Sequence, residues 1–435
     1  MTKHLISFFF AILLIGLASC LNEKEDLSNN PHPSAVSIQT NTLAPDIEST
    51  VFTIDETNLA ISNSDSIAYN SRIDKLVPVF SFAEGVEQIL INGTIWNTTD
   101  SIDFSSPVII QFKAKDKLTT AEYTFKVNKH TVDPEAITWT KRADNFTNLT
   151  NIEEMAGLWF QSQAILFVQK GNETFVLKSN NGQTWTEAIS SNIPLEVSTI
   201  LVHKNAILAI SKNHHLITSV DGINWSIISS SDEISFINIL CSLQNKAWIV
   251  GDKNNITYIY SYNSESETIT EVTTVSDKLP YIEVSKAMMK TKNGIEKSVL
   301  ISGKTNNDTP VYSVFSSMTG DYWVNVITET ASLTFGERIH ATAIWLDSKL
   351  LLFGGSTANN NNLLDVYISS DEGYTWEIAS SNKQLPVEIG ARKKMIGFVD
   401  SNNTLWLIGG IDALGNIQSD VWQGRLNKFD FIKQD

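Results

Sequence analysis

The sequence predicts an all-β protein in which a small antiparallel β-sandwich precedes a six-bladed β-propeller. Short apolar runs of strand period fill residues 36–132, and no stretch keeps a period of 3.6 residues. From residue 133 on, a turn that ends in tryptophan recurs every 40 to 54 residues, close to the ~40–50 residues of a four-stranded blade. The 435 residues, 42% of them hydrophobic, are enough for two packed domains.

The charge balance restricts the class of partner. Lysine and arginine together number 32, aspartate and glutamate 48, and the formal net charge is -16. A chain with this excess of negative charge repels phosphate backbones. We therefore expect no nucleic-acid partner.

The first residues predict a secretion signal that ends in a lipid attachment site. Lys3 precedes an apolar run, residues 6–17, that is too short to span a bilayer as a mature helix. The run leads into Leu17-Ala18-Ser19-Cys20, which resembles the lipobox of bacterial lipoproteins. This resemblance implies that residues 1–19 are a signal peptide and that Cys20 carries a diacylglyceryl group. The alternative is an ordinary signal peptide followed by an incidental cysteine.

Residues 20–35 are expected to form an acidic and polar tether. Residues 21–26, Leu-Asn-Glu-Lys-Glu-Asp, resemble the export signal of surface lipoproteins in Bacteroides-type bacteria. The resemblance implies a protein that is held in the outer membrane by its N-terminal lipid and faces the cell exterior. A tether that is acidic without this role is the alternative.

The second of the two cysteines, Cys241, lies in the apolar run of residues 236–241. Lipidation of Cys20 would remove its only possible partner, so we expect no intrachain disulfide. We interpret Cys241 as a buried structural thiol.

Residues 36–132 predict the sandwich. Turn residues separate five apolar runs of strand period. These runs are residues 51–54, 76–80, 89–91, 108–112 and 123–127. Residues 102–108, together with the last run, resemble the immunoglobulin-like domains at the start of many Bacteroides-type lipoproteins. The resemblance implies an immunoglobulin-like β-sandwich that acts as a spacer.

Residues 133–435 repeat the tryptophan-ended turn. The clearest copy, residues 369–376, reads Ser-Ser-Asp-Glu-Gly-Tyr-Thr-Trp and matches the Asp-box pattern. Weaker copies end at Trp185, Trp225 and Trp323. Residues 138–139 and 268–269 resemble eroded ends of the same unit. Six such ends predict six blades, and a seventh blade would require a further repeat that the sequence does not show.

We interpret the Asp-box as a folding element and not as a catalytic one. Asp371 and its serine are expected to cap the backbone N–H groups of a tight hairpin. Gly373 would supply a positive φ, and Trp376 would pack between neighbouring sheets. In the other copies, the position matched to Asp371 holds Asn180, Val220 or Met318, whereas the final tryptophan persists. A structural role tolerates this variation.

The last two repeats resemble Kelch repeats. In each, an arginine opens the first strand, a double glycine ends the second, and Asp-Val-Tyr or Asp-Val-Trp follows. The arginines are Arg338 and Arg392, and the double glycines are Gly354-Gly355 and Gly409-Gly410. The resemblance implies a Kelch-like propeller.

Ring closure can use either end of the propeller segment. Residues 137–140 or residues 429–431 could supply the outermost strand of the last blade. We favour residues 137–140, because pairing the two ends of the domain removes an unpaired sheet edge.

The Asp-box and Kelch-like resemblances suggest two enzyme classes, sialidases and galactose oxidases. The residues of this chain favour neither class. A sialidase needs three arginines around the carboxylate of its substrate. The propeller has only Arg142, Arg338, Arg392 and Arg425, of which two belong to first strands. A galactose oxidase needs a copper site of two histidines and two tyrosines, which no motif supplies. We predict no catalytic residue, no metal site and no cofactor.

The remaining candidate site is a binding surface at the mouth of the propeller channel, formed by loops between blades and after second strands. These loops are residues 252–255, 306–308, 327–338, 359–362 and 380–391. Arg338, His340, Arg392 and Lys393 are the candidate ligand-binding residues. Short amides around a few cations suit a polar or anionic ligand, such as a glycan or a peptide carboxylate. Solvated turns with asparagine in left-handed conformations are the alternative.

These predictions describe a surface lipoprotein whose propeller binds an extracellular glycan or protein without catalysis. The whole chain resembles a family of Bacteroides-type surface lipoproteins that join an immunoglobulin-like domain to a Kelch-like or sialidase-like propeller and have no assigned reaction. Two alternatives stay open: a sialidase-like exo-glycosidase, and a structural component of an outer-membrane protein complex.

Overall fold

A computed structural model describes residues 27–229, 233–291, 293–307, 309–327 and 335–430. The predicted signal peptide of residues 1–19, the lipidation site Cys20 and the acidic residues 21–26 lie outside the described residues. The chain divides into two compact units, Met1–Asp133 and Pro134–Asp435. No helix in the described ranges has the length and apolar character that crossing a membrane would require.

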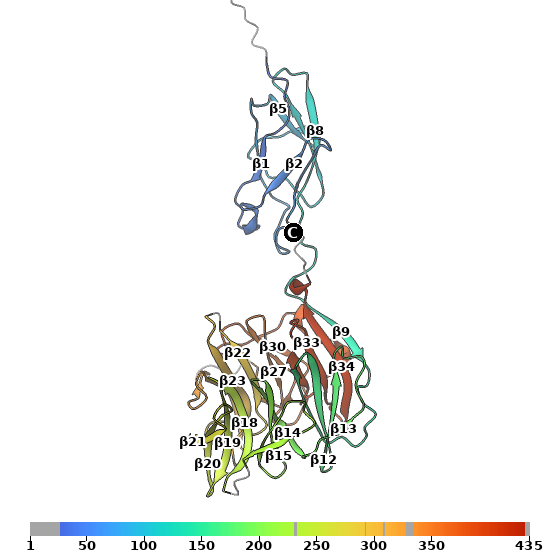
Figure 1. Cartoon of the computed structure of the whole chain (residues 1–435). Helices are drawn as coiled ribbons and strands as arrows, with labels where there is room; N and C mark the ends of the chain where they lie inside the picture. The colour runs from blue at the N-terminus through green and yellow to red at the C-terminus, as the bar shows by residue number, and fades with distance from the viewer. Residues whose placement is uncertain (1–26, 230–232, 292, 308, 328–334, 431–435) are drawn as a thin grey trace, which may run out of the picture. The chain divides into compact units, whose positions relative to one another are not determined.

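The N-terminal unit contains two sheets (Figure 1). The smaller sheet pairs β1 (Ala35–Ile38) with β4 (Pro78–Ser81). The larger sheet has the order β2 (Phe52–Asp55), β3 (Ala60–Asn63), β8 (Thr120–Lys126), β7 (Val108–Lys113), β5 (Gln88–Ile91) and β6 (Thr94–Ile95). The five predicted runs overlap β2, β4, β5, β7 and β8. The short strands β1, β3 and β6 are not predicted by the sequence.

One strand pair differs from the antiparallel sandwich that the sequence predicts. β3 pairs with β8 in parallel, with Ala60 opposite Thr124 and Ser62 opposite Lys126. Parallel neighbours need a long connection, and the strands that lie between β3 and β8 in the chain provide it. The prediction was wrong at this pair because a strand-period run carries no information on strand direction.

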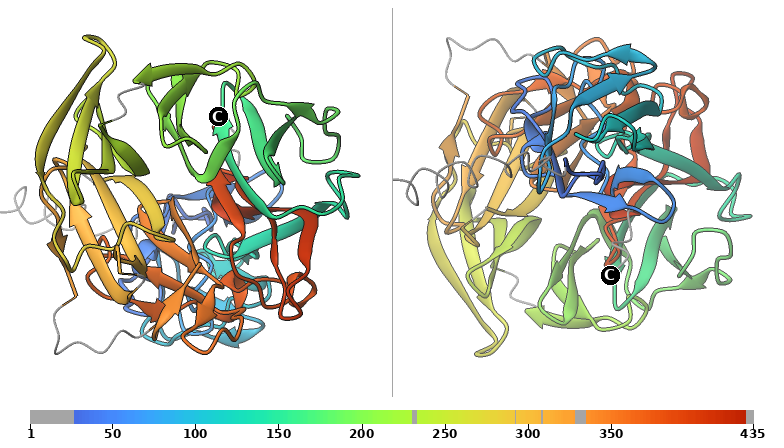
Figure 2. Two further views of the ribbon diagram at one scale, coloured as in Figure 1. Left: turned by 90° about the horizontal axis from the view of Figure 1, so that it is seen from below. Right: turned by 90° about the horizontal axis from the view of Figure 1, so that it is seen from above.

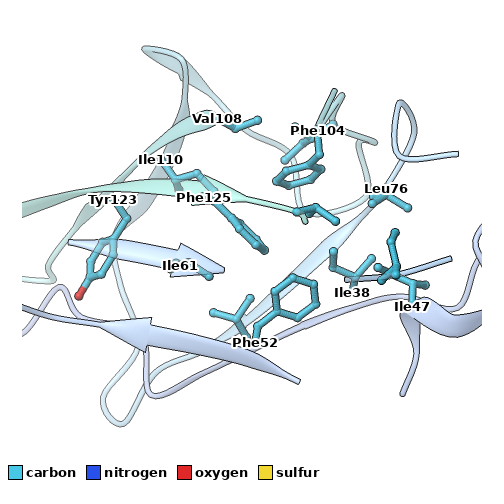
Figure 3. Close-up of a cluster of buried hydrophobic side chains, with 14 of the residues drawn as sticks. Ile38, Ile47, Phe52, Ile61, Leu76, Phe104, Val108, Ile110, Tyr123 and Phe125 are labelled. Carbon is cyan, nitrogen blue, oxygen red and sulfur yellow. The ribbon is translucent and has the colours of Figure 1, made fainter. Parts of the chain in front are cut away.

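One hydrophobic core joins the two sheets of this unit. Figure 3 shows Phe52, Ile61 and Phe125 from the larger sheet packed with Ile38 from β1. Phe104 meets Phe125 edge to face, with 4.8 Å between ring centroids. The alternating burial along β8 follows from its alternating apolar residues.

The C-terminal unit contains six four-stranded antiparallel sheets among its described residues. We number them along the chain, innermost strand first. Sheet 1 is β10 (Glu154–Phe160), β11 (Gln163–Lys170), β12 (Glu173–Ser179) and β13 (Ile189–Ser190). Sheet 2 is β14 (Leu195–His203), β15 (Ala206–Ser211), β16 (Leu216–Ser219) and β17 (Ser226–Ser229). Sheet 3 is β18 (Ser235–Leu243), β19 (Lys246–Lys253), β20 (Ile256–Asn263) and β21 (Thr268–Thr274).

Sheet 4 is β22 (Ser285–Lys290), β23 (Glu296–Lys304), β24 (Pro310–Ser317) and β25 (Val324–Asn325). Sheet 5 is β27 (Thr342–Leu346), β28 (Lys349–Phe353), β30 (Val366–Ser369) and β31 (Glu377–Ile378). Sheet 6 is β32 (Ile396–Val399), β33 (Leu405–Ile411), β34 (Ile417–Leu426) and β9 (Ile137–Ala143). A small ladder, β26 (Arg338–Ile339) with β29 (Ser356–Thr357), precedes sheet 5. The protein is thus all-β, with a β-propeller domain after an N-terminal β domain.

The six sheets surround a common centre (Figure 2). Each innermost strand contacts that of the next sheet, in the order β10, β14, β18, β22, β27 and β32, and β32 contacts β10. β34 pairs with β9, Leu426 opposite Ile137 and Val421 opposite Ala143. This is the ring closure that the sequence favours. Phe429, on the rejected alternative, lies in a 3₁₀ turn.

The second strand of each sheet needs this closed ring, because apolar residues cover both of its faces. β11 is buried continuously from Ala164 to Val168, and β28 from Leu350 to Phe353. A sheet with one wet face would alternate buried and exposed residues. Neighbouring sheets must therefore cover both faces, and a ring gives every sheet two neighbours.

The tryptophan-ended hairpins connect the third and fourth strands of sheets 1, 2, 4 and 5. In sheet 5, the Ser369 hydroxyl accepts a bond from the Gly373 N–H at 2.8 Å, and Asp371 accepts one from the Thr375 N–H at 2.8 Å. The Trp376 indole N–H donates to the Gly373 carbonyl at 3.1 Å. The same serine, glycine and tryptophan bonds recur at Trp185, Trp225 and Trp323.

The structure corrects the alignment of these hairpins. The residues that occupy the place of Asp371, two positions after the serine, are Asn181, Asp221 and Thr319, and not Asn180, Val220 and Met318 as predicted. Asp221 accepts bonds from two following N–H groups at 2.8 Å, and Asn181 does so at 2.9 and 3.0 Å. The clearest copy has one extra residue before its glycine, so alignment on the tryptophan shifted the acidic position by one.

The hairpin glycines and tryptophans contact the preceding sheet in the ring. All four glycines have positive φ, from 75° at Gly182 to 98° at Gly373. A Cβ atom on Gly320 would lie 2.3 Å from the Trp248 indole, so no side chain fits there. Trp376 is 6% exposed and packs in one cluster with Val299 and Val314 of sheet 4. The hairpins therefore join neighbouring sheets.

We expect Trp376→Ala to lower the free energy of unfolding of the propeller by about 3–5 kcal/mol, because it leaves a large cavity between sheets 4 and 5. Ten of the 11 tryptophans lie in the propeller segment, so urea unfolding followed by fluorescence reports on this unit. Tyr374→Ala, at a side chain that is 52% exposed, is the matched control and should cost less than about 1 kcal/mol. Equal costs for both changes would contradict the proposed packing role.

Glu135 connects the closing strand to sheet 5. It precedes β9, and its carboxylate lies 2.7 Å from Lys349 Nζ, 3.2 Å from Lys383 Nζ and 2.8 Å from Lys428 Nζ. Burial would raise the pKa of Glu135, but the bonds from the three lysines lower it to about 2. The carboxylate is therefore ionised and stabilises the closed ring.

This pKa predicts acid sensitivity. The folded value of about 2 lies below the ordinary value of 4.5, so the contribution of Glu135 is complete above pH 4.5 and is lost as the pH falls toward 2. Glu135→Gln should lower stability at pH 7 by about 1–2 kcal/mol, a value reduced by partial exposure to solvent. The difference from the natural protein should vanish near pH 2, as measured by thermal melts. Glu187→Gln, at an exposed glutamate, should show no such convergence.

Candidate functional site

A cavity of about 260 Å³ lies at the centre of the ring. Its walls come from β10, β14, β22, β27 and β32 and from the residues just before these strands. Five titratable side chains line it, among small and aliphatic residues. They are Glu154, Glu283, Lys286, His340 and Lys394. We call this space the axial cavity.

Three of these residues occupy equivalent and unusual positions. Glu283, His340 and Lys394 each stand two residues before the innermost strand of sheets 4, 5 and 6. Their φ angles are 50°, 58° and 55°, in the left-handed region that L-residues other than glycine rarely adopt. We call them the left-handed triad.

The second-strand glycines explain this backbone. A Cβ atom on Gly303, Gly355 or Gly410 would lie 2.8–3.0 Å from the carbonyl oxygen just before each triad residue. These glycines let the incoming chain pair with the end of the second strand, through the bridges Ile282–Lys304 and Lys393–Ile411 and the β26–β29 ladder. The chain must then reverse within one residue to start the innermost strand, and the left-handed conformation does this.

The double-glycine position is therefore present in three sheets and not in two. In sheet 4 it reads Ser302-Gly303, with φ 50° and 134°. The sequence shows this copy only weakly, because serine replaces the first glycine.

The triad side chains interact across sheets. Glu283 Oε2 lies 3.0 Å from His340 Nε2 and 2.8 Å from Lys304 Nζ. Lys394 Nζ lies 3.8 Å from Glu283 and 3.7 Å from Glu154 of the neighbouring sheet 1. The Lys394 N–H also donates to the His340 carbonyl at 2.9 Å. Ionisable groups from four sheets thus form one connected cluster.

The pKa values of this cluster follow from burial and neighbouring charges. Burial would raise the pKa of Glu283, but Lys304, His340 and Lys394 lower it to about 2. Burial lowers the pKa of His340, against the opposing effect of Glu283. At neutral pH the cavity therefore presents an ionised carboxylate beside a neutral imidazole.

Two of the four predicted ligand-binding residues are buried structural residues. Arg338 is 2% exposed, pairs with both carboxylate oxygens of Asp365 at 2.9 and 3.1 Å and donates to the Gly354 carbonyl at 3.0 Å. Arg392 is 6% exposed and pairs in the same way with Asp420 and the Gly409 carbonyl. Each guanidinium binds the aspartate that follows the double glycine in its own sheet. We therefore remove both from the candidate site.

The other two predicted residues are separated by the structure. His340 lines the axial cavity, whereas Lys393 does not and donates to the Asn360 side chain. Glu154, Glu283, Lys286 and Lys394 also line the cavity and were not predicted from the sequence. The sequence contains one indication of Lys394: it stands two residues after Arg392, as His340 does after Arg338.

The thiol of Cys241 does not line this cavity. Cys241 is a free, buried cysteine, as predicted, and burial raises its pKa to about 12. Among the described residues, no group of three or more histidine, cysteine, aspartate or glutamate side chains is placed to hold a metal ion.

Fold and site together define a protein with an N-terminal β domain and a β-propeller that has a polar axial cavity. The chain belongs to the DUF6242 family. Residues 133–434 match the DUF6242 beta propeller domain, and residues 23–127 match the N-terminal domain of the same family, described as a domain of unknown function. No curated protein matches the chain.

Solved structures with a related fold share little sequence with this chain. YjhT is 12% identical, with a TM-score of 0.46, and the match covers 63% of this chain and 95% of YjhT. A fungal alcohol oxidase of the AA5 family, in complex with copper, is 11% identical, with a TM-score of 0.47 and coverage of 66% and 76%. An alpha-L-arabinanase of Penicillium chrysogenum, complexed with arabinobiose, is 10% identical, with a TM-score of 0.43 and coverage of 66% and 99%. Similarity at this level says nothing about activity.

The buried arginine pairs generate a prediction. Arg392→Met should lower the free energy of unfolding by about 3–5 kcal/mol, because it leaves the Asp420 carboxylate buried without its partner. The double variant Arg392→Met, Asp420→Leu should recover part of this loss, since both charges are then gone. Chemical denaturation measures the free energy of unfolding of the natural protein and of both variants. A single variant that costs under about 1 kcal/mol would return Arg392 to the list of ligand-binding candidates.

Proposed function

We propose that the protein is a cell-surface lipoprotein whose six-bladed propeller binds an extracellular ligand, a glycan or a protein segment, in the axial cavity without catalysis. The left-handed triad is the observation that carries this proposal. Three polar residues from consecutive sheets adopt a costly backbone conformation at one place, and their side chains line the same cavity.

Backbone strain supports a binding role. The left-handed conformation costs about 1–2 kcal/mol for each residue other than glycine, and strained residues cluster at ligand sites. Glycine at these positions would avoid much of this cost. A fold that needed only the chain reversal would be more stable with glycine, so we infer that the side chains of Glu283, His340 and Lys394 are retained for what they contact.

The arrangement favours binding over catalysis. A glycosidase needs a carboxylic acid that stays protonated near neutral pH, and Glu283 does not supply it, because its pKa is lowered to about 2. A sialidase-like exo-glycosidase would also need arginines at the cavity. Arg338 and Arg392 are instead buried against aspartates, and Arg142 and Arg425 donate to the backbone carbonyls of Asn181 and Asn402. We keep the exo-glycosidase as the weaker alternative.

The location in the cell stays part of the proposal. A lipid on Cys20, the acidic tether and an immunoglobulin-like spacer over residues 36–132 would hold the propeller at the outer face of the outer membrane. A structural component of an outer-membrane complex is the second alternative, and it would not need a ligand in the cavity.

The purified full chain in detergent should bind members of a broad array of glycans and peptides. Ser198 is exposed and lines the axial cavity, so Ser198→Phe should fill the space and weaken binding at least tenfold without unfolding the ring. Ser190→Phe is the matched control, because Ser190 is an exposed serine on the outermost strand of sheet 1. It should bind as the natural chain does.

Two outcomes would contradict the proposal. One is the absence of binding across the array. The other is binding that Ser198→Phe leaves intact, provided that thermal melts show both variants folded. Release of sugar from the array would instead support the exo-glycosidase.

A further inference from the structure

Lys286 is a half-buried cation of the axial cavity that does not belong to the left-handed triad. It is the second residue of β22, and it lines the axial cavity. Its ammonium group donates to the Ile239 carbonyl at 3.0 Å, to Asn238 Oδ1 at 3.2 Å and to the Ser198 carbonyl at 3.4 Å. All three acceptors are neutral.

The ammonium has no counter-ion among the residues that the structure describes. Cys241 lies near the Lys286 ammonium and could balance its charge only as a thiolate. Burial raises the pKa of this thiol to about 12, so it stays neutral. The carboxylates of Glu154 and Glu283 are already balanced by Lys394 and Lys304. Of the two lysines that line the cavity, only Lys286 therefore lacks a carboxylate partner among the described residues.

The scaffold holds this cation in place. The Asn238 amide accepts from Lys286 and donates to the Tyr281 carbonyl at 2.6 Å, so its orientation is fixed. The pairing of β18 shifts register on both sides of Asn238 and Ile239. That of β14 shifts between Glu196 and Leu201, and this bulge brings Ser198 to the cavity. Bulges beside sites of function re-aim backbone groups in this way.

Even partial burial of a cation without a counter-ion is unfavourable, and a bound anion would offset the cost. Burial lowers the pKa of Lys286 to about 8, the direction expected for an ammonium without a counter-ion. The cavity volume of about 260 Å³ lies just below the ~300–1,000 Å³ of typical ligand pockets, so it suits one compact group.

We propose that Lys286 is the anion subsite of the axial cavity and that it binds the carboxylate of an acidic monosaccharide unit. This inference rests on the proposed function and names the ligand class of the same cavity. Ser198 is exposed, and its carbonyl accepts a bond from Lys286. The ionised Glu283 and neutral His340 offer partners for sugar hydroxyls, and Val284 and Ala341 offer an apolar wall.

Calorimetry with the full chain in detergent tests the inference with defined sugars. D-glucuronate, D-galacturonate and N-acetylneuraminate are compared with D-glucose, D-galactose and N-acetylglucosamine. We expect at least one acidic sugar to bind ten times more tightly than its neutral counterpart. Lys286→Met and Lys286→Gln should remove this preference, and Lys286→Arg should keep most of it. Lys286→Gln retains an amide donor without charge, so it covers the case in which Lys286→Met does not fold.

Lys393→Met is the matched control, because Lys393 lies close to the cavity in the chain but does not line it. It should leave the acidic preference unchanged. Lack of an acidic preference, or a preference that both neutral Lys286 variants keep, would overturn the inference. If a ligand depends on Ser198 but not on the charge at position 286, the proposed function stands and this inference fails. If glycyl-glutamate shows the only charge-dependent binding, a peptide replaces the sugar and the proposal is likewise overturned.

Discussion

The structure depends on one packing constraint: the second strand of each propeller sheet is apolar on both faces. β11 and β28 are buried along almost their whole length, so each sheet must have a neighbour on either side. Only a closed ring satisfies this for all six sheets at once. The β34–β9 pairing completes the ring, and the tryptophan-ended hairpins fill the gaps between sheets.

The axial cavity is a consequence of this closure. Innermost strands that meet around a centre cannot all bring their side chains to the same point, and the space they leave is lined by whichever residues start those strands. In sheets 4, 5 and 6 the chain reverses direction just before the innermost strand. A glycine of the second strand allows the incoming chain to approach closely at this point. The residue at this reversal, Glu283, His340 or Lys394, therefore lines the cavity. The site is thus asymmetric, although the sheets repeat.

The arginines show how a repeat motif can mislead a search for a site. Arg338 and Arg392 are among the few propeller cations that the Kelch-like pattern marks. Each forms an ion pair with the aspartate of its own sheet, so neither is available to a ligand. The residues two positions later carry no motif of their own, yet they line the cavity. Lys286 has no sequence signal at all, because its neighbours Ser198, Asn238 and Ile239 come from other sheets. His340 was the one predicted residue that the cavity retains.

By itself, the sequence determined the all-β class, the propeller and the pairing of its two ends. These features are set by local periodicity, turn chemistry and the spacing of repeats, which a single chain displays along its length. Only the tertiary structure decided the parallel β3–β8 pair, the place of Asp221 in its hairpin and the membership of the axial cavity. The reason is that strand direction and side-chain convergence depend on contacts between residues far apart in the chain. The hydrogen bonds of Lys286 and the ion pair of Arg392 exist only once the ring has closed.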